Sequence, residues 1–278
     1  MAKFMSFYIN RKPNTFIKCA IILWLPIFMS SCDSVGQINL TDVQCIGHRG
    51  NVVDDNFQNT MDSFLSAFNI GADGIELDIF HTKDDVAMVF HDKALSNNAK
   101  SKPGMNCPID KGIADFNFKD LSTNCMLKNG DDIPSLEDVL LQFFETDFTI
   151  YIEFKDRPKQ KTINLIYQIY NDDLSRIKGT VFMKDFLTDP FSKVYSPKFE
   201  LLIANSFYVQ GLEHGFSGVD VSSISNDNVQ RLQYFNKKIG LYGVNTRKDL
   251  IQAFNLRVNY ITTDSLESCV SVKQELLL

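Results

Sequence analysis

Apolar runs of strand length recur along this chain, and most segments between them carry apolar residues at helical spacing. Helical periodicity covers residues 60–69, 135–145, 159–173, 227–237 and 247–256. Strands that alternate with helices are typical of a parallel sheet packed against helices, so the pattern predicts an α/β protein. The nine strand-like runs are residues 43–48, 74–80, 86–91, 148–155, 179–184, 199–204, 217–221, 238–244 and 258–263.

The second and third runs lie too close together to be parallel neighbours. Only five residues separate 74–80 from 86–91, whereas a parallel crossover needs about a dozen. We therefore predict an antiparallel hairpin that turns at Lys83 to Asp85. Eight strands then remain for the sheet, which is the number in a closed TIM-type (β/α)8 barrel.

A polar stretch without clear periodicity, from Lys93 to Ile133, follows the hairpin. A loop of this length in a compact barrel is often functional, so we expect an insertion after the second strand, at about 93–133. It contains Cys107 and Cys125, and a disulfide between them would stabilise an exported protein by roughly 3 kcal/mol in the loop-entropy model. Two free thiols are the alternative.

Three carboxylates lie inside the apolar strand-like runs. Glu76 and Asp78 share one face of their strand, because side chains alternate between the two faces. Glu153 and Lys155 repeat this spacing in F-T-I-Y-I-E-F-K, at 148–155. Burying unpaired carboxylates is costly, and a bound cation removes the cost. Oxygen ligands suit a hard divalent ion such as calcium or magnesium, so we expect Glu76 and Asp78 to face a bound cation, with Glu153 as a third carboxylate of the same site.

Two histidines end strand-like runs near these acids. His48 closes the first run and precedes Arg49, and His91 closes the third run. In the predicted hairpin, His91 falls opposite Glu76 or Asp78. Histidines transfer protons near neutral pH, and Arg49 and Lys155 suit phosphate oxygens. The combination suits a phosphate ester as substrate.

At these positions the sequence resembles the glycerophosphodiester phosphodiesterase family, within the PLC-like phosphodiesterase superfamily. The resemblance extends from about position 43 to 266. Its main motifs are H-R-G at 48–50, N-T at 59–60, G-A-D-G-I-E-L-D at 71–78, T-K-D at 82–84 and H-D at 91–92. Weaker matches are I-P-S-L-E-D-V-L from 133, I-E-F-K from 152, V-N-T from 244 and I-T-T-D from 261.

The resemblance implies a TIM-type barrel, a divalent metal on Glu76, Asp78 and Glu153, and acid/base histidines at His48 and His91. It also implies hydrolysis of glycerophosphodiesters to glycerol 3-phosphate and an alcohol. A lysophospholipid or sphingolipid head group is an alternative substrate. A catalytically silent envelope lipoprotein that binds phosphodiesters or a partner is an alternative of another class.

Two positions depart from the family pattern. Gln58 stands where the family usually has a glutamate, so a hydrogen-bonding group remains without its charge. Tyr242 stands where the family usually has a tryptophan, so an aromatic face is kept.

The first 31 residues resemble a bacterial export signal. Four basic residues and no acid accompany an apolar stretch of eleven residues, 19–29, which is shorter than the roughly 20 residues of a membrane-spanning helix. M-S-S-C at 29–32 is similar to a lipoprotein cleavage box. We expect Cys32 to be lipidated and to anchor the protein to a membrane of the cell envelope, facing the periplasm or the exterior. Ordinary cleavage nearby and an uncleaved anchor are the alternatives.

The net charge and the length of the chain limit its possible partners and its number of domains. The chain has 28 basic and 34 acidic residues, so loss of the four leader cations leaves 24 basic residues and a net charge near −10. This charge disfavours nucleic acid as a partner. Residues 32–278 have the length of one barrel domain.

The remaining candidates receive simpler interpretations. We expect Cys45 and Cys269 to be buried free thiols, with Cys45 facing the helices because its parity is opposite to that of His48. Asp92 is expected to orient His91 or the hairpin, and Asp264 to cap the last helix. Two further histidines, His81 and His214, are expected to be exposed and without a role, and Lys184 ends a strand from which it could reach substrate.

Overall fold

The computed structural model describes residues 38–52, 57–171, 173–182, 199–204 and 216–278. Cys32, Lys184 and His214 therefore lie outside the described residues. Among the helices that are described, none has both the length and the hydrophobicity needed to cross a membrane.

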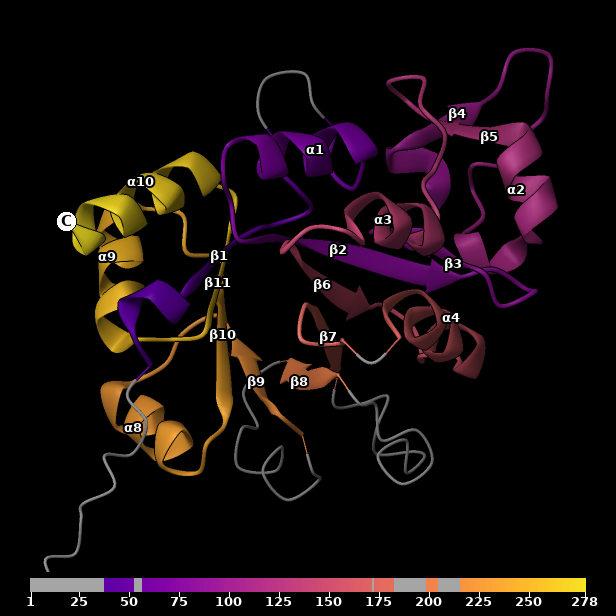
Figure 1. Cartoon of the computed structure of the whole chain (residues 1–278). Coiled ribbons are helices and arrows are strands. Elements are labelled where there is room, and N and C mark those ends of the chain that lie inside the picture. The colour runs from indigo at the N-terminus through magenta and orange to yellow at the C-terminus, as the bar shows by residue number, and fades with distance from the viewer. Residues whose placement is uncertain (1–37, 53–56, 172, 183–198, 205–215) are drawn as a thin grey trace, which may run out of the picture. The chain divides into compact units, whose positions relative to one another are not determined.

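Eight parallel strands form a closed barrel (Figure 1). Closure follows from β1, which pairs with β2 on one side and with β11 on the other. The predicted TIM-type barrel is therefore confirmed. Its strands are β1 (Gln44–Gly47), β2 (Gly74–His81), β6 (Thr149–Phe154), β7 (Ile177–Phe182), β8 (Glu200–Ala204), β9 (Gly218–Val221), β10 (Lys238–Tyr242) and β11 (Tyr260–Thr263).

Helices pack outside the strand ring (Figure 1). Four of them begin at a Ser or Thr whose hydroxyl accepts the N–H of the third helical residue, at Thr60, Ser135, Ser225 and Thr246. Such caps satisfy backbone donors that the helix leaves free. The helices are α1 (Met61–Asn69), α3 (Leu136–Phe143), α4 (Gln160–Tyr170), α8 (Asn226–Tyr234), α9 (Arg247–Leu256) and α10 (Leu266–Leu277). A 3₁₀ turn, η1 (Leu40–Asp42), precedes the barrel.

Strand alternation separates two environments. Outward side chains such as Ile75 and Ile150 join the large core between strands and helices, whereas Ile46 and Tyr151 belong to a small core inside the barrel. Glu76 is buried, with the parity of the inward set. The fold thus directs the acids of β2 and β6 into the barrel rather than toward the helices.

The predicted hairpin is present. β3 (Ala87–Val89) pairs antiparallel with β2, and Ile79 lies opposite Val89. The N–H of Phe90 donates to the carbonyl oxygen of Asp78. Phe90, not His91, is therefore opposite Asp78, so the predicted register is wrong by one residue.

The insertion packs on the hairpin around a second, smaller core that includes Met88 and Phe90 of the hairpin. A disulfide joins Cys107 to Cys125, the pair proposed from the sequence. Short elements around one crosslink do not produce a long periodic pattern, which explains why the sequence showed none. The elements are η2 (Leu95–Asn97), β4 (Ala99–Ser101), η3 (Ile113–Asp115), α2 (Phe118–Asn124) and β5 (Cys125–Leu127).

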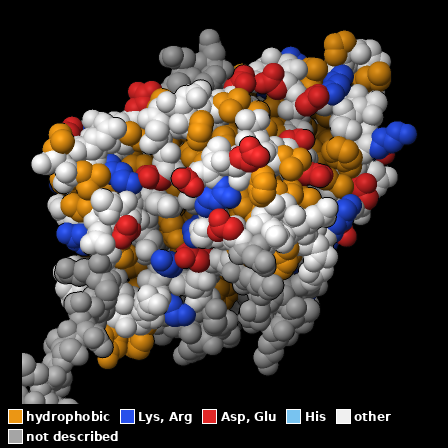
Figure 2. All heavy atoms as spheres, in the orientation of Figure 1, with side chains coloured by type: hydrophobic (Ala, Val, Ile, Leu, Met, Phe, Trp, Pro, Cys, Tyr) orange, Lys and Arg blue, Asp and Glu red, His pale blue; other side chains and the backbone are white. Residues whose placement is uncertain are grey.

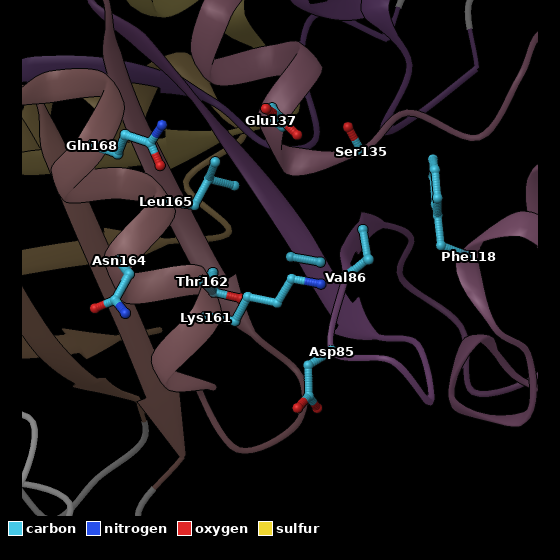
Figure 3. Close-up of a pocket in the computed structure, with 11 residues that line it drawn as sticks. Asp85, Val86, Phe118, Ser135, Glu137, Lys161, Thr162, Asn164, Leu165 and Gln168 are labelled. Carbon is cyan, nitrogen blue, oxygen red and sulfur yellow. The ribbon is translucent and has the colours of Figure 1, made fainter.

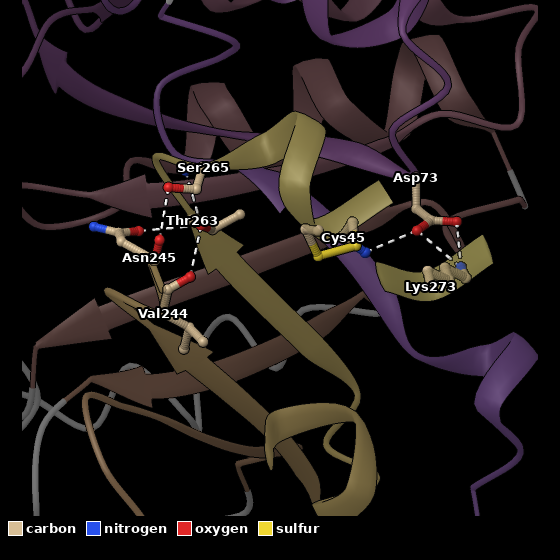
Figure 4. Close-up of a disulfide and its surroundings, with 8 residues drawn as sticks. Cys45, Asp73, Val244, Asn245, Thr263, Ser265 and Lys273 are labelled. Atoms are coloured by element: carbon tan, nitrogen blue, oxygen red, sulfur yellow. Dashed lines mark hydrogen bonds and ion pairs between the residues drawn. A yellow bond between two sulfur atoms is a disulfide. The ribbon is translucent and has the colours of Figure 1, made fainter. Parts of the chain in front are cut away.

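Cys45 and Cys269 are not free thiols, which corrects the sequence-based expectation. They form a disulfide between β1 and α10 across 224 residues of sequence. Figure 4 shows a second tie at the same place: Asp73 accepts from the backbone N–H of Cys45 and from the ammonium of Lys273. The last helix is therefore joined to the first strand by a covalent bond, and to Asp73, which precedes β2, by an ion pair.

His81 is buried, not exposed as expected. Its Nδ1 lies 2.6 Å from Asp156 Oδ1, and its Nε2 lies 2.8 Å from Thr162 Oγ1. Asp156 also accepts from the backbone N–H of His81. His81 thus connects the end of β2 to the segment after β6 and to α4.

Candidate active site

A cavity of about 310 Å³ lies at the carboxyl ends of the barrel strands. Barrel enzymes carry their chemistry at this end, because the loops after the strands converge there. Among the sequence-predicted residues, His48, Arg49, Glu76 and Glu153 line the cavity. The other lining residues are Phe182, Ala204, Asp220, Tyr242, Gly243, Thr262 and Asp264.

Glu76, Asp78 and Glu153 come together as predicted. One carboxylate oxygen from each lies within 4.8 Å of the others. Asp78 is opposite Glu153 in the β2–β6 register, and Glu76 lies two residues earlier on the same face of β2. Two of the three, Glu76 and Asp78, are buried. The barrel thus gathers three acids from two adjacent strands.

Burial and mutual repulsion act against ionisation in this cluster. Burial, followed by the charges of Asp78 and Glu153, raises the pKa of Glu76 well above its ordinary value. Burial and the charge of Glu153 also raise the pKa of Asp220 to about 7. Among the described residues, two cations, Arg49 and Lys155, accompany these four acids, so the described charges sum to a negative value when all four acids are ionised.

The donor set fits a divalent cation. The oxygen ligands are those that calcium or magnesium prefers. Glu76 Oε1 is buried without a hydrogen-bond partner among the described residues, which is a costly arrangement that coordination would relieve. Glu76, Asp78 and Glu153 are the side chains that would hold the ion.

Lys155 forms ion pairs with carboxylates of both β2 and β6. Its Nζ lies 2.9 Å from Asp78 Oδ1 and also contacts Glu153. Burial alone would lower the pKa of Lys155, but Asp78 and Glu153 outweigh it and the pKa is raised. Lys155 therefore stays charged.

Arg49 is held from three directions. Its Nε lies 3.1 Å from Asp78 Oδ2, its NH1 donates to Gln58 Oε1 at 2.7 Å, and its backbone N–H donates to Glu76 Oε2. Gln58, which stands in place of the family's usual glutamate, thus supports Arg49 by a neutral hydrogen bond. Asn59 supports the same group by donating to Asp78 Oδ2 at 2.8 Å.

The turn after β1 requires a glycine. Gly50 has φ of +94°, and a Cβ there would lie 2.4 Å from the Ser63 hydroxyl oxygen. A larger residue would be strained by both conformation and contact. Ser63 in turn donates to the carbonyl oxygen of Arg49. This packing explains why the H-R-G motif presents His48 and Arg49 together.

His48 is paired with Asp264, a residue that the sequence suggested only as a helix cap. Their Nδ1 and Oδ1 atoms lie 2.6 Å apart, and Ser265 is the residue that precedes α10. Burial raises the pKa of Asp264, but hydrogen bonding to His48 outweighs it and the pKa is lowered. An ionised carboxylate only accepts, so Nδ1 of His48 carries the proton and Nε2 is left for chemistry. Asn245 donates to the other Asp264 oxygen at 2.7 Å.

His91 has a similar support. Its Nδ1 lies 2.8 Å from Asp92 Oδ1, and Asn98 donates to Asp92 Oδ2 at 2.8 Å. The predicted orienting contact of Asp92 is therefore present. Asn98 belongs to the insertion, which thus helps to orient this histidine. His91 is not among the described residues that line the cavity.

A larger cavity, of about 440 Å³, is lined by residues of the hairpin, the start of α3 and α4, together with Phe118 (Figure 3). None of the candidate catalytic, metal or phosphate residues lines it. Several of its polar groups have partners within the fold: Thr162 contacts His81, and Lys161 donates to the Asp84 carbonyl oxygen. Its size therefore does not make it the better candidate site.

Acidic and basic side chains are interspersed on the face of the molecule shown in Figure 2. This face shows no broad basic patch of the kind that binds nucleic acid. The distribution agrees with the acidic composition of the chain.

Two curated relatives match part of the chain. The lysophospholipase D of Homo sapiens is 31% identical over 145 residues, which are 48% of this chain and 44% of that protein. A glycerophosphodiester phosphodiesterase of Caldanaerobacter subterraneus is 30% identical over 116 residues, covering 40% and 44%. The chain therefore matches less than half the length of each of these relatives.

Solved structures match over most of the barrel. A glycerophosphodiester phosphodiesterase from Parabacteroides distasonis has a TM-score of 0.71 at 21% identity, covering 87% of this chain and all of that one. A phosphodiesterase from Oleispira antarctica, solved with sn-glycerol 3-phosphate, has a TM-score of 0.65 at 17% identity, covering 83% and 96%. At these identities the likeness shows the fold.

A sequence model that represents one protein family matches this chain. It matches residues 48–186, half of the chain, and this range contains the H-R-G turn and the three acids. The chain belongs to the glycerophosphoryl diester phosphodiesterase family.

Proposed function

We propose that this protein hydrolyses glycerophosphodiesters to glycerol 3-phosphate and an alcohol with the help of a divalent metal ion. The observation that carries the proposal is the convergence of three carboxylates, Arg49 and Lys155 beside the His48–Asp264 pair. Family membership supports the reaction class. The Oleispira antarctica structure, whose bound molecule is the same product, supports the choice of substrate.

In this reaction Arg49 and Lys155 bind phosphate oxygens, since both cations lie at the acid cluster. One of His48 and His91 takes a proton from the nucleophile, which is water or the glycerol hydroxyl next to the phosphate. Attack by water releases glycerol 3-phosphate directly, whereas attack by the hydroxyl forms a cyclic phosphate that water then opens to glycerol 3-phosphate. The other gives a proton to the oxygen of the departing alcohol. When bound, the metal supplies Lewis-acid stabilisation of the phosphate charge.

Turnover is expected to stop in excess chelator and to return with magnesium or calcium. The reason is that three carboxylates face two cations among the described residues, so ionisation of all three needs a further positive charge. Glu153→Gln should weaken metal binding, because it removes one of the three carboxylates. The measurement is hydrolysis of a glycerophosphodiester panel, with metal affinity from calorimetry.

Glu137→Gln is the matched control, since Glu137 lies in the larger cavity and outside the acid cluster. Full activity in chelator, or equal metal affinity of the two variants, would contradict the proposed metal site. Hydrolysis of no diester by intact protein would favour the silent binding lipoprotein.

A lysophospholipid is a second candidate substrate, because one matching relative is named a lysophospholipase D. Sphingolipids are a related alternative. The same substrate panel separates them: a lysophospholipid with higher kcat/KM than glycerophosphocholine would displace glycerophosphodiesters as the main substrate.

We propose that the protein is exported, that residues 1–31 are removed as a lipoprotein signal, and that a lipid on Cys32 anchors residues 32–278 to the cell envelope. The Cys45–Cys269 and Cys107–Cys125 disulfides support this proposal, since structural disulfides are typical of oxidising compartments.

Cys32→Ser is expected to release the protein from membranes or to block its processing, because the thiol that would carry the lipid is lost. Membrane fractionation and mass spectrometry of the mature N-terminus measure this. Cys19→Ser, within the proposed leader, is the matched control. An unmodified N-terminus at another residue would refute lipidation of Cys32.

A further inference from the structure

Two buried side chains on the wall of the candidate active site each have an oxygen without a hydrogen-bond partner among the described residues. Asp220 on β9 is 5% exposed and Thr262 on β11 is 3% exposed. Both line the cavity that holds Glu76 and Glu153. Asp220 Oδ1 and Thr262 Oγ1 have no hydrogen-bond partner among the described residues.

The space around Asp220 is kept open by a glycine. Gly240 on β10 is paired with Asp220, and a Cβ at Gly240 would lie 2.5 Å from Asp220 Oδ1 and 3.1 Å from Tyr151 Oη. Any larger residue would therefore fill this space. The buried Tyr151 hydroxyl lies beside the same carboxylate, and its hydrogen bonding lowers the pKa of Asp220.

Leaving such groups unpaired costs about 1–3 kcal/mol each, and a ligand group that pairs with them would remove this cost. A phosphate is a poor match for Asp220, because its oxygens are acceptors and carry the same sign of charge. A hydroxyl is a good match, since it can donate to the carboxylate and accept from the Thr262 or Tyr151 hydroxyl.

We propose that Asp220 and Thr262 recognise a hydroxyl group of the alcohol esterified to the phosphate, and thereby favour phosphate esters of polyols over those of simple alkyl alcohols. This inference rests on the proposed phosphodiesterase function, because it assigns to the same cavity a region for the alcohol beside the region for the phosphate. Asp220 and Thr262 are then specificity-determining residues, distinct from the groups proposed to bind phosphate or move protons.

The test compares two ligands that differ only in hydroxyl groups. Glycerol 3-phosphate and propyl phosphate are titrated by calorimetry into the full-length chain at pH 7 with a fixed magnesium concentration. Wild type should bind glycerol 3-phosphate about tenfold or more tightly than propyl phosphate. Thr262→Val and Asp220→Ala should each reduce this ratio toward one while leaving propyl phosphate affinity within about twofold.

Thr180→Val is the matched control. Thr180 is also a buried threonine with an unpartnered hydroxyl among the described residues, but it is not among the described residues that line the cavity. It should leave the ratio unchanged. Asp220→Asn keeps an acceptor oxygen and should retain part of the preference, so it carries the test if Asp220→Ala fails to fold.

Equal binding of the two ligands by wild type would overturn the proposal. An unchanged ratio in Thr262→Val and in Asp220→Asn would also overturn it, because the two groups would then pair with ordered water. Failure of the proposed function has a different signature: wild type would hydrolyse no diester, whatever the ratio of the two binding constants.

Discussion

Replacing Cys45 and Cys269 together with alanine is expected to lower the free energy of unfolding by about 5 kcal/mol. The bond closes a loop of 224 residues, so its loss frees most of the barrel sequence in the unfolded chain. A domain is typically stable by only 5–15 kcal/mol, so the double variant should be close to its folding limit. Denaturant unfolding of oxidised protein measures the change.

The second disulfide is the internal control. Cys107 and Cys125 are 18 residues apart, and their joint replacement should cost about 3 kcal/mol in the loop-entropy model. The alanine variants lose the packing of the sulfur atoms as well as the bond. Mild reduction of wild type breaks both bonds and keeps the sulfur atoms, so it separates the two effects. Unfolding of oxidised and reduced wild type at the same denaturant concentration would contradict a stabilising role for either bond.

Strand positions could be predicted from the sequence because alternation and strand length are local properties. The same parity argument placed Glu76, Asp78 and Glu153 on inward faces and Cys45 outward. The disulfide partner of Cys45 was missed because Cys269 lies at the other end of the chain. Loop closure over such a distance leaves no local pattern.

The burial of His81 depends on the barrel and not on strand parity alone. Its parity is opposite to that of the acids, as predicted from the sequence. In a barrel, however, the outward face is covered by helices rather than by water, so an outward histidine is buried and needs partners. Asp156 and Thr162 provide them. The predicted barrel and the strand parity together imply that His81 is buried under the helices.

Asp264 could also have been found. It directly follows β11, and closure of an eight-stranded barrel places β11 beside β1, whose end carries His48. The signal was the strand order. Asp220 was harder to identify, because a carboxylate in G-V-D-V becomes informative only when its missing partners and the neighbouring Gly240 are known.

His48→Ala and His91→Ala are each expected to reduce the rate of glycerophosphodiester hydrolysis by roughly 10² to 10⁴. His48 lies on the cavity wall, and the Nδ1 of each histidine contacts a carboxylate, which leaves Nε2 for proton transfer. Folding and metal binding should change little, because neither histidine belongs to the acid cluster. Steady-state kinetics across pH measure the effect, and wild type should give a bell-shaped profile. His214→Ala, which sequence suggests has no role, is the control.

The two histidines can then be distinguished by leaving group. A p-nitrophenyl ester of glycerol phosphate has an acidic leaving group and needs no general acid, so it should restore activity to one single variant and not to the other. The double variant should be scarcely slower than the worse single one, because groups on one proton path act as a unit. The result for His91 is decisive, since it is not among the described residues that line the cavity. Near-normal hydrolysis of a natural glycerophosphodiester by His91→Ala would refute the acid/base pair and leave His48 with Asp264 as the proton-transfer group.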